Sequence, residues 1–380
     1  MSTDAVIAGA AESRYTRARA RPTADRLASA VRLALFDAGL ELRDVDGLAV
    51  ASFSLAPDHA IDLAWRLGLR LRWIMEDTNG GASGVNMLQH AVRAVEAGDA
   101  EVVVLVAGDA FGEDDFRGLV EGYNTATRDV LAPLPAGGPN ALFALLTRRH
   151  MERHGLRREH YGHVAIAQRE WAALNPGAVY RTPITMRDYL QAPLVADPLG
   201  LYDCVPVVAG ADALVVAAAG RSPRGLAVRV RALAALHNHD QQEGEGLQTG
   251  LAEVAPRLWE EAELGPADVD VASVYDDYPA LVLVQLEDLG FVPESDVARF
   301  VEGRIATRSL AVNTSGGQLS AGQAGAGGGM HGLVEAVRQL RLEAGPRQVE
   351  GAATAVATGY GMVLYRHGAC AGAAVLERAS

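Results

Sequence analysis

The sequence predicts an α/β protein built from two similar halves. Strand and amphipathic-helix patterns alternate in the first 110 residues and again after residue 226, an order typical of a mostly parallel sheet with helices on its faces. The features of residues 81–109 also recur in residues 322–359: a glycine-rich turn, a helix with Ala-Val-Arg near its end, and a buried strand. This recurrence indicates a duplicated unit.

The first half is predicted to contain short strands joined by helices. Apolar runs and alternating apolar residues predict strands, and apolar residues at helical spacing predict helices. The first predicted helix begins at Pro22 and Thr23 and ends at Gly39, as residues of these types commonly do. The predicted strands are 4–11, 45–52, 71–76 and 101–109, and the predicted helices are 22–40, 59–69 and 82–97.

The middle of the chain differs because turn residues dominate it. Segments such as "APLPAGGPN" and "NPGAVYRTP" predict a long insertion over the core, in which "GEDDF" is an acidic turn. Helices are predicted at 139–154 and 158–174, and a strand at 210–219 returns to the sheet. The predicted domains are an N-terminal half (1–110 with 206–222), a cap insertion (111–205) and a C-terminal half (223–380).

The alternation of strands and helices restarts in the second half. The same patterns predict a strand and turn at 308–317, where the sequence is "RSLAVNTSGG". Further strands are predicted at 226–237, 269–276, 351–361 and 368–378, and helices at 247–263, 278–290 and 321–342.

Composition limits the classes of function. The net charge of −13 argues against nucleic acid or an anionic membrane as partner, and no apolar run reaches the about 18 residues of a membrane span. The N-terminal stretch lacks the apolar core of a signal peptide. Two cysteines form no disulfide framework and no zinc site by spacing, which fits a reducing cytoplasm. All 34 lysine-or-arginine positions are arginine, so a lysine Schiff base is excluded.

Three segments carry a specific resemblance. They are "NGGASG" (79–84), "VYDDYPALVLVQLEDLGF" (274–291) and "NTSGGQLSAGQAGAGGG" (313–329). Their order within two α/β halves resembles the thiolase superfamily, most closely the sterol-carrier-protein-type or lipid-transfer thiolase-like proteins. The resemblance implies two βαβαβαββ halves in five αβαβα layers, an acyl-CoA substrate and a homodimer.

The residues at the family's catalytic positions differ here. The family places a nucleophilic cysteine at the start of a buried helix, and Gly81 stands at that position. The family's Gly-His-Pro histidine corresponds to Gln323, and the His or Asn of the middle motif corresponds to Tyr275. The last family cysteine falls in "ATGYGMV", where Tyr360 is the one acid–base side chain. These replacements argue against thiolysis through an acyl-enzyme.

One branch of the superfamily works without the cysteine. The lipid-transfer-type aldolases of steroid side-chain breakdown cleave a β-hydroxyacyl-CoA by a retro-aldol step that uses tyrosines, together with a small partner protein carrying a zinc ribbon and an OB fold. The resemblance therefore implies C–C bond cleavage or formation, of retro-aldol or retro-Claisen type, on an acyl-CoA. Such a lyase needs a base and hydrogen-bond donors for the thioester enolate. This chain departs from the branch because no tyrosine lies near Gln323.

The resemblance suggests these site residues. Tyr360, with Tyr275 or His331, would move protons, and Asp276 is a further candidate because paired carboxyls raise each other's pKa. The N–H groups near Gly81 and Gly361 and the Gln323 amide would hold the thioester oxygen, with Asn313 also at the substrate. No metal is expected, and coenzyme A enters as part of the substrate.

Each candidate also has a structural interpretation. Packing is the structural interpretation of His331 and Tyr275, and capping of the following helix is that of one carboxyl of the pair Asp276 and Asp277. Cys204 and Cys370 are interpreted as buried small hydrophobic residues. The motif "HNHD" at 237–240 is interpreted as a solvated loop, because no third metal ligand stands nearby.

Two other functions stay open. The chain could be a non-catalytic subunit of a heteromeric acyl-CoA thiolase, contributing architecture to a catalytic or zinc-ribbon partner. It could also be an acyltransferase that uses no enzyme cysteine.

Overall fold

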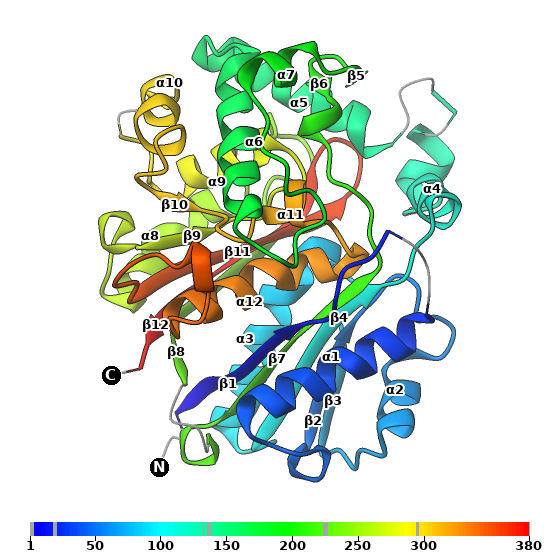
Figure 1. Cartoon of the computed structure of the whole chain (residues 1–380). Coiled ribbons are helices and arrows are strands. Elements are labelled where there is room, and N and C mark those ends of the chain that lie inside the picture. Colours follow the sequence, from blue (N-terminus) through cyan, green and yellow to red (C-terminus); the bar gives the residue numbers. More distant parts are fainter. Residues whose placement is uncertain are drawn as a thin grey trace.

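The computed structural model describes residues 4–17, 21–131, 133–134, 138–222, 227–293 and 296–379. Its described strands form one 10-stranded sheet in the order β10-β9-β11-β12-β8-β1-β7-β4-β2-β3, and β5 pairs with β6 separately. Figure 1 shows this sheet running through the whole molecule. The two halves of the chain meet where β1 pairs with β8.

The first half supplies five strands and three long helices. In chain order these elements are β1 (Ala5–Glu12), α1 (Thr23–Ala38), β2 (Gly47–Ala51), α2 (His59–Leu67), β3 (Trp73–Glu76), α3 (Ser83–Ala97), β4 (Val102–Asp109) and β7 (Gly210–Ala218).

The second half repeats this arrangement. Its elements are β8 (Val228–His237), α8 (Leu251–Ala262), β9 (Val271–Ser273), α9 (Pro279–Asp288), α10 (Val297–Phe300), β10 (Ala311–Val312), α11 (Gly317–Ala321), α12 (Gly328–Leu340), β11 (Thr354–Val363) and β12 (Gly368–Arg378). Helices α3 and α12 hold equivalent places, as do strands β4 and β11. The duplication predicted from the sequence is therefore visible in the fold.

Among the described residues, three large apolar clusters lie between the helix and sheet layers, which number five. Helices α1 and α2 pack on the outer face of the first half of the sheet, and α8 and α9 pack on the outer face of the second half. Helices α3 and α12 lie between the two halves and contact strands of both. Strand β4 is buried along its whole length, which is why its sequence is a continuous apolar run. The predicted αβαβα thiolase fold is thus confirmed.

The prediction of a mostly parallel sheet is wrong. Strand β2 pairs in parallel with β3 and β4, and β9 pairs in parallel with β10 and β11. Strands β7 and β12 return to the sheet antiparallel to β4 and β11, and also pair antiparallel with β1 and β8. The sheet is mixed because the last strand of each half, β7 or β12, lies next to the strand before it in that half and runs in the opposite direction. Antiparallel neighbours need no right-handed crossover.

The long segment between β4 and β7 carries α4 (Glu113–Glu121), α5 (Pro139–His154), α6 (Arg158–Ala173), α7 (Met186–Gln191), β5 (Leu194–Ala196) and β6 (Leu199–Gly200). We call residues 110–209 the connecting segment. Figure 1 shows its helices α5, α6 and α7 (green) above the second half, near α9, and α4 at the side. The three-domain division drawn from the sequence remains a prediction.

Several local predictions were wrong. The acidic turn "GEDDF" is the start of α4, where carboxylates are favoured by the helix dipole. The helix predicted at 321–342 begins only at Gly328, because α11 and a turn at Gly322 precede it. Helices α7 and α10 were missed, because both are short. Residue 226 of one predicted strand, and part of the turn-rich stretch 132–140, lie outside the described residues.

Among the described residues, no helix combines the length and the apolar character needed to cross a membrane.

Candidate active site

The turn between β3 and α3 is filled by a side chain from the other half. A short 3₁₀ helix, Gly80–Ala82, makes this turn, and Gly81 in it is buried. A Cβ atom added to Gly81 would lie 2.2 Å from ring atoms of Tyr275 and 2.4 Å from its Oη. The ring of Tyr275 therefore occupies the space into which a nucleophile at position 81 would project.

Tyr275 belongs to a hydrogen-bonded group with Gln323 and Asp277. The Gln323 amide Nε2 donates to Tyr275 Oη at 3.3 Å and to Asp277 Oδ1, and Tyr275 is also hydrogen-bonded to Asp277. The backbone of Gln323 is fixed by bonds to Pro206 and Val208 of the connecting segment. The group therefore joins the second and third motifs. Its third member, Asp277, was considered from the sequence only as the pair partner of Asp276.

This group lies at a cavity of about 690 Å³. Its lining includes helix α4, the first residues of α5, and the side chains of Cys204, Asp277, Tyr278 and Gln323. Tyr278 holds the start of α5 in place, since its Oη donates to Asn140 Oδ1 at 2.7 Å and its ring stacks on Phe143 with centroids 4.7 Å apart. The volume is in the range of sites for small molecules and cofactors.

Asp277 has the acid–base properties that a proton-transfer site needs. Burial raises its pKa to about 7, although hydrogen bonds from Tyr275 and Gln323 favour the charged carboxylate. Both forms of the carboxyl are then present near neutral pH, which suits a general base or acid.

The neighbouring phenols and the thiol stay protonated. Burial, together with the charge of Asp277, raises the pKa of Tyr275 well above its usual value and that of Tyr123 to about 12. Tyr123 reaches the same turn, and its Oη would lie 3.0 Å from a Cβ on Gly80. Burial, Asp203 and Asp277 raise the pKa of the Cys204 thiol to about 12. Cys204 therefore lines the cavity as a neutral thiol, which is a poor nucleophile.

Tyr360 lies behind this group and away from the cavity lining. It is inside strand β11, 2 % exposed, and its Oη accepts a hydrogen bond from the Gly368 N–H at 2.6 Å. Its ring centroid is 6.4 Å from that of Tyr275. Gly361 packs against the turn, because a Cβ there would lie 2.3 Å from the Asn79 carbonyl oxygen. Only glycine permits this close approach of β11 to the turn.

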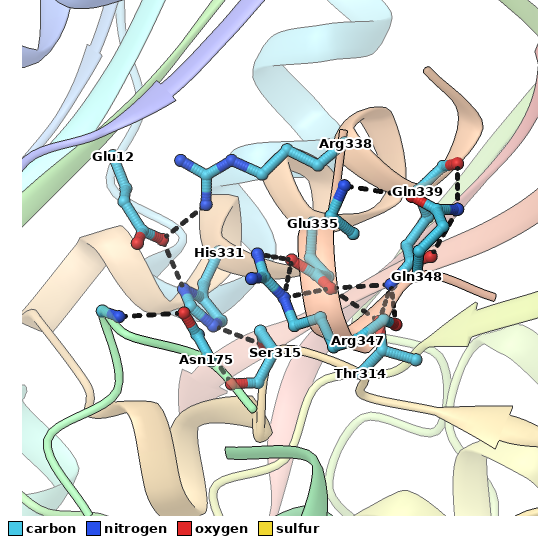
Figure 2. Close-up of polar contacts among 12 residues, drawn as sticks. Glu12, Asn175, Thr314, Ser315, His331, Glu335, Arg338, Gln339, Arg347 and Gln348 are labelled. Carbon is cyan, nitrogen blue, oxygen red and sulfur yellow. Dashed lines mark hydrogen bonds and ion pairs between the residues drawn. The ribbon is translucent and has the colours of Figure 1, made fainter. Parts of the chain in front are cut away.

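His331 is held in a separate buried network. Its Nε2 lies 2.7 Å from Ser315 Oγ, and its Nδ1 lies 3.1 Å from Tyr15 Oη. Figure 2 shows His331 between Ser315 and Glu12, beside Arg338. Burial lowers the pKa of His331, so the neutral imidazole is favoured.

Asp276 and Asn313 also hold backbone in place. The Asp276 carboxylate accepts hydrogen bonds from the N–H groups of Gln318 (3.0 Å) and Leu319 (3.2 Å). It therefore caps α11. The expectation that one carboxyl of this pair caps the following helix α9 is wrong, because the N-cap residue of α9 is Tyr278 and no side chain caps that helix. The Asn313 Oδ1 accepts from the Val274 N–H at 2.8 Å. Asp276, Asn313, Tyr275 and His331 border a second buried cavity of only about 10 Å³.

The structure thus separates the eight predicted residues into groups. It brings Gly81, Tyr275 and Gln323 together beside the large cavity. It sets Tyr360 and Gly361 behind them on β11, and it places His331, Asp276 and Asn313 around the small cavity. Asp277, Tyr278 and Tyr123 were not predicted as site residues. The first two stand in the motif "YDDY", but adjacent residues there point in different directions, and the sequence does not say which faces the cavity.

Comparisons with known proteins show the family to which this chain is similar. A family described as "Thiolase C-terminal domain-like" matches residues 232–376. The 17-hydroxy-3-oxo-4-pregnene-20-carboxyl-CoA lyase of Mycobacterium tuberculosis is 35% identical over 364 residues, covering 90% of this chain and 92% of the relative. The steroid side-chain-cleaving aldolase of Thermomonospora curvata is 33% identical, covering 89% of this chain and 90% of the relative.

A solved structure is similar over nearly the whole chain. It is described as "Ltp2-ChsH2(DUF35) aldolase", and it superposes with a TM-score of 0.85 at 28% identity, covering 99% of this chain and 98% of its own. The chain belongs to the thiolase superfamily, among its lipid-transfer and sterol-carrier-protein-type members, and is close to the steroid side-chain-cleaving aldolases.

Proposed function

We propose that this protein is a lyase that cleaves the carbon–carbon bond between the α and β carbons of a β-hydroxyacyl-CoA, or forms it in the reverse direction. The observation that carries the proposal is the ring of Tyr275, which fills the place of a nucleophile and is bonded to Asp277 and Gln323 at the cavity. An acid–base step needs no acyl-enzyme. Two relatives of more than 30% identity are named as a CoA-ester lyase and an aldolase, which supports the same class.

The proposed reaction balances with one proton moved by the protein. The Asp277 carboxylate takes the proton of the β-hydroxyl group, and the bond between the α and β carbons breaks. Its electron pair passes into the thioester to give an enolate, while the β carbon becomes a carbonyl. The Gln323 amide donates a hydrogen bond to the enolate oxygen, as electrostatic stabilisation requires. The α carbon then takes a proton from Asp277, which restores the carboxylate.

The remaining predicted residues have supporting roles in this proposal. Tyr275 holds Asp277 in position by its phenol hydrogen bond and excludes water from the turn at Gly81. Tyr360 supports the ring of Tyr275 from behind, and Gly361 lets β11 approach the turn. Asp276, Asn313 and His331 keep α11 and the start of α12 in place.

The proposal extends to partners and location. Coenzyme A would enter as part of the substrate, the chain would form a homodimer, and nucleic acid would not be a partner. A small zinc-ribbon and OB-fold protein is proposed as a further subunit, supported by the solved neighbour whose description joins Ltp2 to ChsH2(DUF35). We place the protein in the cytoplasm, since Cys204 and Cys370 are unbonded thiols.

An assay of the purified chain tests the proposal. The chain, alone and with the partner, is incubated with 17-hydroxy-3-oxo-4-pregnene-20-carboxyl-CoA and a panel of simpler β-hydroxyacyl-CoA esters. The expected result is a ketone or aldehyde product and no mass increase of the intact protein. Transfer of the acyl group to a second substrate, with no carbon–carbon cleavage and no protein adduct, would favour the acyltransferase instead. No turnover with any ester or partner would favour a non-catalytic subunit.

A further inference from the structure

We propose a second site in this protein, a zinc-binding centre formed by His150, His154 and Glu287. His150 and His154 are four residues apart near the end of α5, so they lie on the same face of that helix. Glu287 lies near the end of α9 and faces both histidines. The site therefore lies where the connecting segment packs on the second half of the fold.

The three side chains converge within the reach of one ion. His150 Nε2 lies 2.8 Å from Glu287 Oε1, and His154 Nε2 lies 3.3 Å from Glu287 Oε2. One ligand atom from each residue lies within 4.8 Å of the other two. Ligand atoms that bind one tetrahedral zinc at ~2.0–2.1 Å are roughly 3.3 Å apart, so small rotations of these side chains suffice.

The surroundings of the cluster also suit a metal. The Nδ1 of His150 lies 2.8 Å from the phenol oxygen of Tyr161 on α6. A proton on Nδ1 would be donated to that oxygen, which leaves the lone pair of Nε2 directed at Glu287. Histidine ligands of metals are commonly oriented by such an outer partner. The side chains of His150, His154 and Glu287 are 0%, 11% and 18% exposed, so the ligands are largely shielded from water.

A fourth ligand has room to bind. A cavity of about 640 Å³ adjoins the cluster and is lined in part by His154, Glu287 and Asp288. Arg153 also lines it, and its guanidinium is paired with Glu245 at 2.9 Å. Three protein ligands and one open position are typical of zinc sites that bind water or a substrate. Two imidazoles and one carboxylate favour zinc over calcium or magnesium, which prefer oxygen ligands alone.

The other histidine–carboxylate cluster found among the described residues is a poorer candidate. Glu12, Asp212 and His331 also lie within 4.8 Å of one another by one ligand atom each. There, however, the guanidinium of Arg338 lies 3.2 Å from Glu12. Figure 2 draws this ion pair beside His331. A cation already present would repel a metal ion, so the proposal is restricted to the cluster on α5 and α9.

Zinc at this position would connect two elements of the active-site wall. Helix α5 begins at Pro139 beside the 690 Å³ cavity, and α9 begins next to Tyr278 in the same wall. His150 lies ten residues from Asn140, or ~15 Å along the helix. A metal joining the far ends of α5 and α9 would fix the position of both helices at the cavity.

Metal titration of the chain tests the proposal. The untagged full-length chain, purified without its partner and stripped by a chelator, is titrated with Co²⁺ and Zn²⁺. The wild-type protein is expected to bind one ion, with the Co²⁺ absorption of a four-coordinate site and a raised melting temperature. His154→Ala and Glu287→Gln are expected to weaken binding by more than ~100-fold, and Tyr161→Phe by ~10–100-fold.

His90→Ala is the matched control, because His90 is an exposed histidine on α3 outside the cluster. It should bind zinc as the wild-type protein does. The proposal is overturned if the wild-type chain shows no saturable binding, or if His154→Ala and Glu287→Gln still bind one ion with unchanged affinity. If either variant fails to fold, the Co²⁺ spectrum of the wild-type chain still tests the proposal. Absence of the absorption of a four-coordinate site would overturn it.

Discussion

Tyr275 and Gly81 share one volume at the centre of the site. The absence of a side chain at Gly81 is what allows the ring of Tyr275 to reach its hydrogen bonds with Gln323 and Asp277. The glycine at position 81 and the placement of the Tyr275 phenol are therefore two parts of one arrangement.

This pairing predicts strong coupling between the two positions. Gly81→Ala should destabilise the protein by ~1–3 kcal/mol or more, because the added Cβ would overlap the Tyr275 ring. In a Tyr275→Ala background the same substitution should cost little. Urea unfolding of the four proteins of the double-mutant cycle measures the coupling free energy.

Gly118→Ala is the control for that cycle. Nothing lies within 4 Å of a Cβ at Gly118 in α4, so this substitution should be neutral or slightly stabilising. If the effects of Gly81→Ala and Tyr275→Ala are additive, the two residues do not share the space.

The raised pKa of Asp277 predicts a pH-dependent stability. Because burial raises this pKa to about 7 from its ordinary value of 3.8, the folded chain binds the proton more tightly than the unfolded chain. The contribution of this carboxyl to stability is complete below pH ~4 and is lost as pH rises through ~7. Asp277→Asn should therefore gain stability relative to wild type between pH 5 and pH 8, on the order of 1 kcal/mol or more.

Unfolding in urea at pH 5 and pH 8 measures this difference. Asp114→Asn is the control, since the side chain of Asp114 is 95% exposed and should show no such change. If the wild-type protein instead becomes more stable relative to Asp277→Asn as pH rises from 5 to 8, the carboxyl is not buried in the way described.

At the scale of elements, the central helix α12 is anchored by a buried ion pair. Arg347 Nη2 lies 2.8 Å from Glu335 Oε2, and Thr314 Oγ1 donates to Glu335 Oε1 at 2.7 Å (Figure 2). Burial alone would raise the pKa of Glu335, but its bonds with Arg347 outweigh this and lower it. These contacts fix α12 between the segment after β10 and the segment before β11.

Arg347→Ala should therefore destabilise the protein by ~3–5 kcal/mol, because it leaves Glu335 as an unpaired buried charge. Arg257→Ala breaks an exposed ion pair with Glu261 four residues away and should cost no more than ~0.5 kcal/mol. Chemical unfolding at neutral pH compares the two. Equal and small losses would mean that the pair does not anchor α12.

Sequence patterns predicted long elements well and the site only in part. Helix α5 was predicted at its observed bounds, because its helical spacing and its proline start are local signals. The antiparallel pairing of β7 with β4 depends on the path of the connecting segment between them, and no local sequence pattern predicts that path. In the same way, "DD" at 276–277 does not say that Asp276 caps α11 while Asp277 faces the cavity, since both outcomes arise from contacts distant in sequence.

At the scale of the whole molecule, β3 ends the sheet of the first half. Among the described strands it pairs with β2 alone, and its Ile74 is 42% exposed. A strand with an open edge and an exposed apolar side chain favours pairing with another chain.

Ile74→Lys is therefore expected to convert the proposed homodimer to a monomer. Light scattering coupled to size-exclusion chromatography measures the mass. Leu33→Lys is the matched control, because Leu33 is similarly exposed (44%) but lies on the outer helix α1. A dimer that persists in Ile74→Lys would place the contact elsewhere on the molecule.

The dependence of kcat/KM on pH, with a cleavable β-hydroxyacyl-CoA, tests most directly whether Asp277 is the base. For the wild-type chain the rate should rise with pH to a plateau, with an apparent pKa near 7, because the carboxylate is the active form. Asp277→Asn should lose ~10²–10⁴-fold and show no inflection near 7. An Asp277→Asn variant with full activity and the wild-type pH profile would contradict the account.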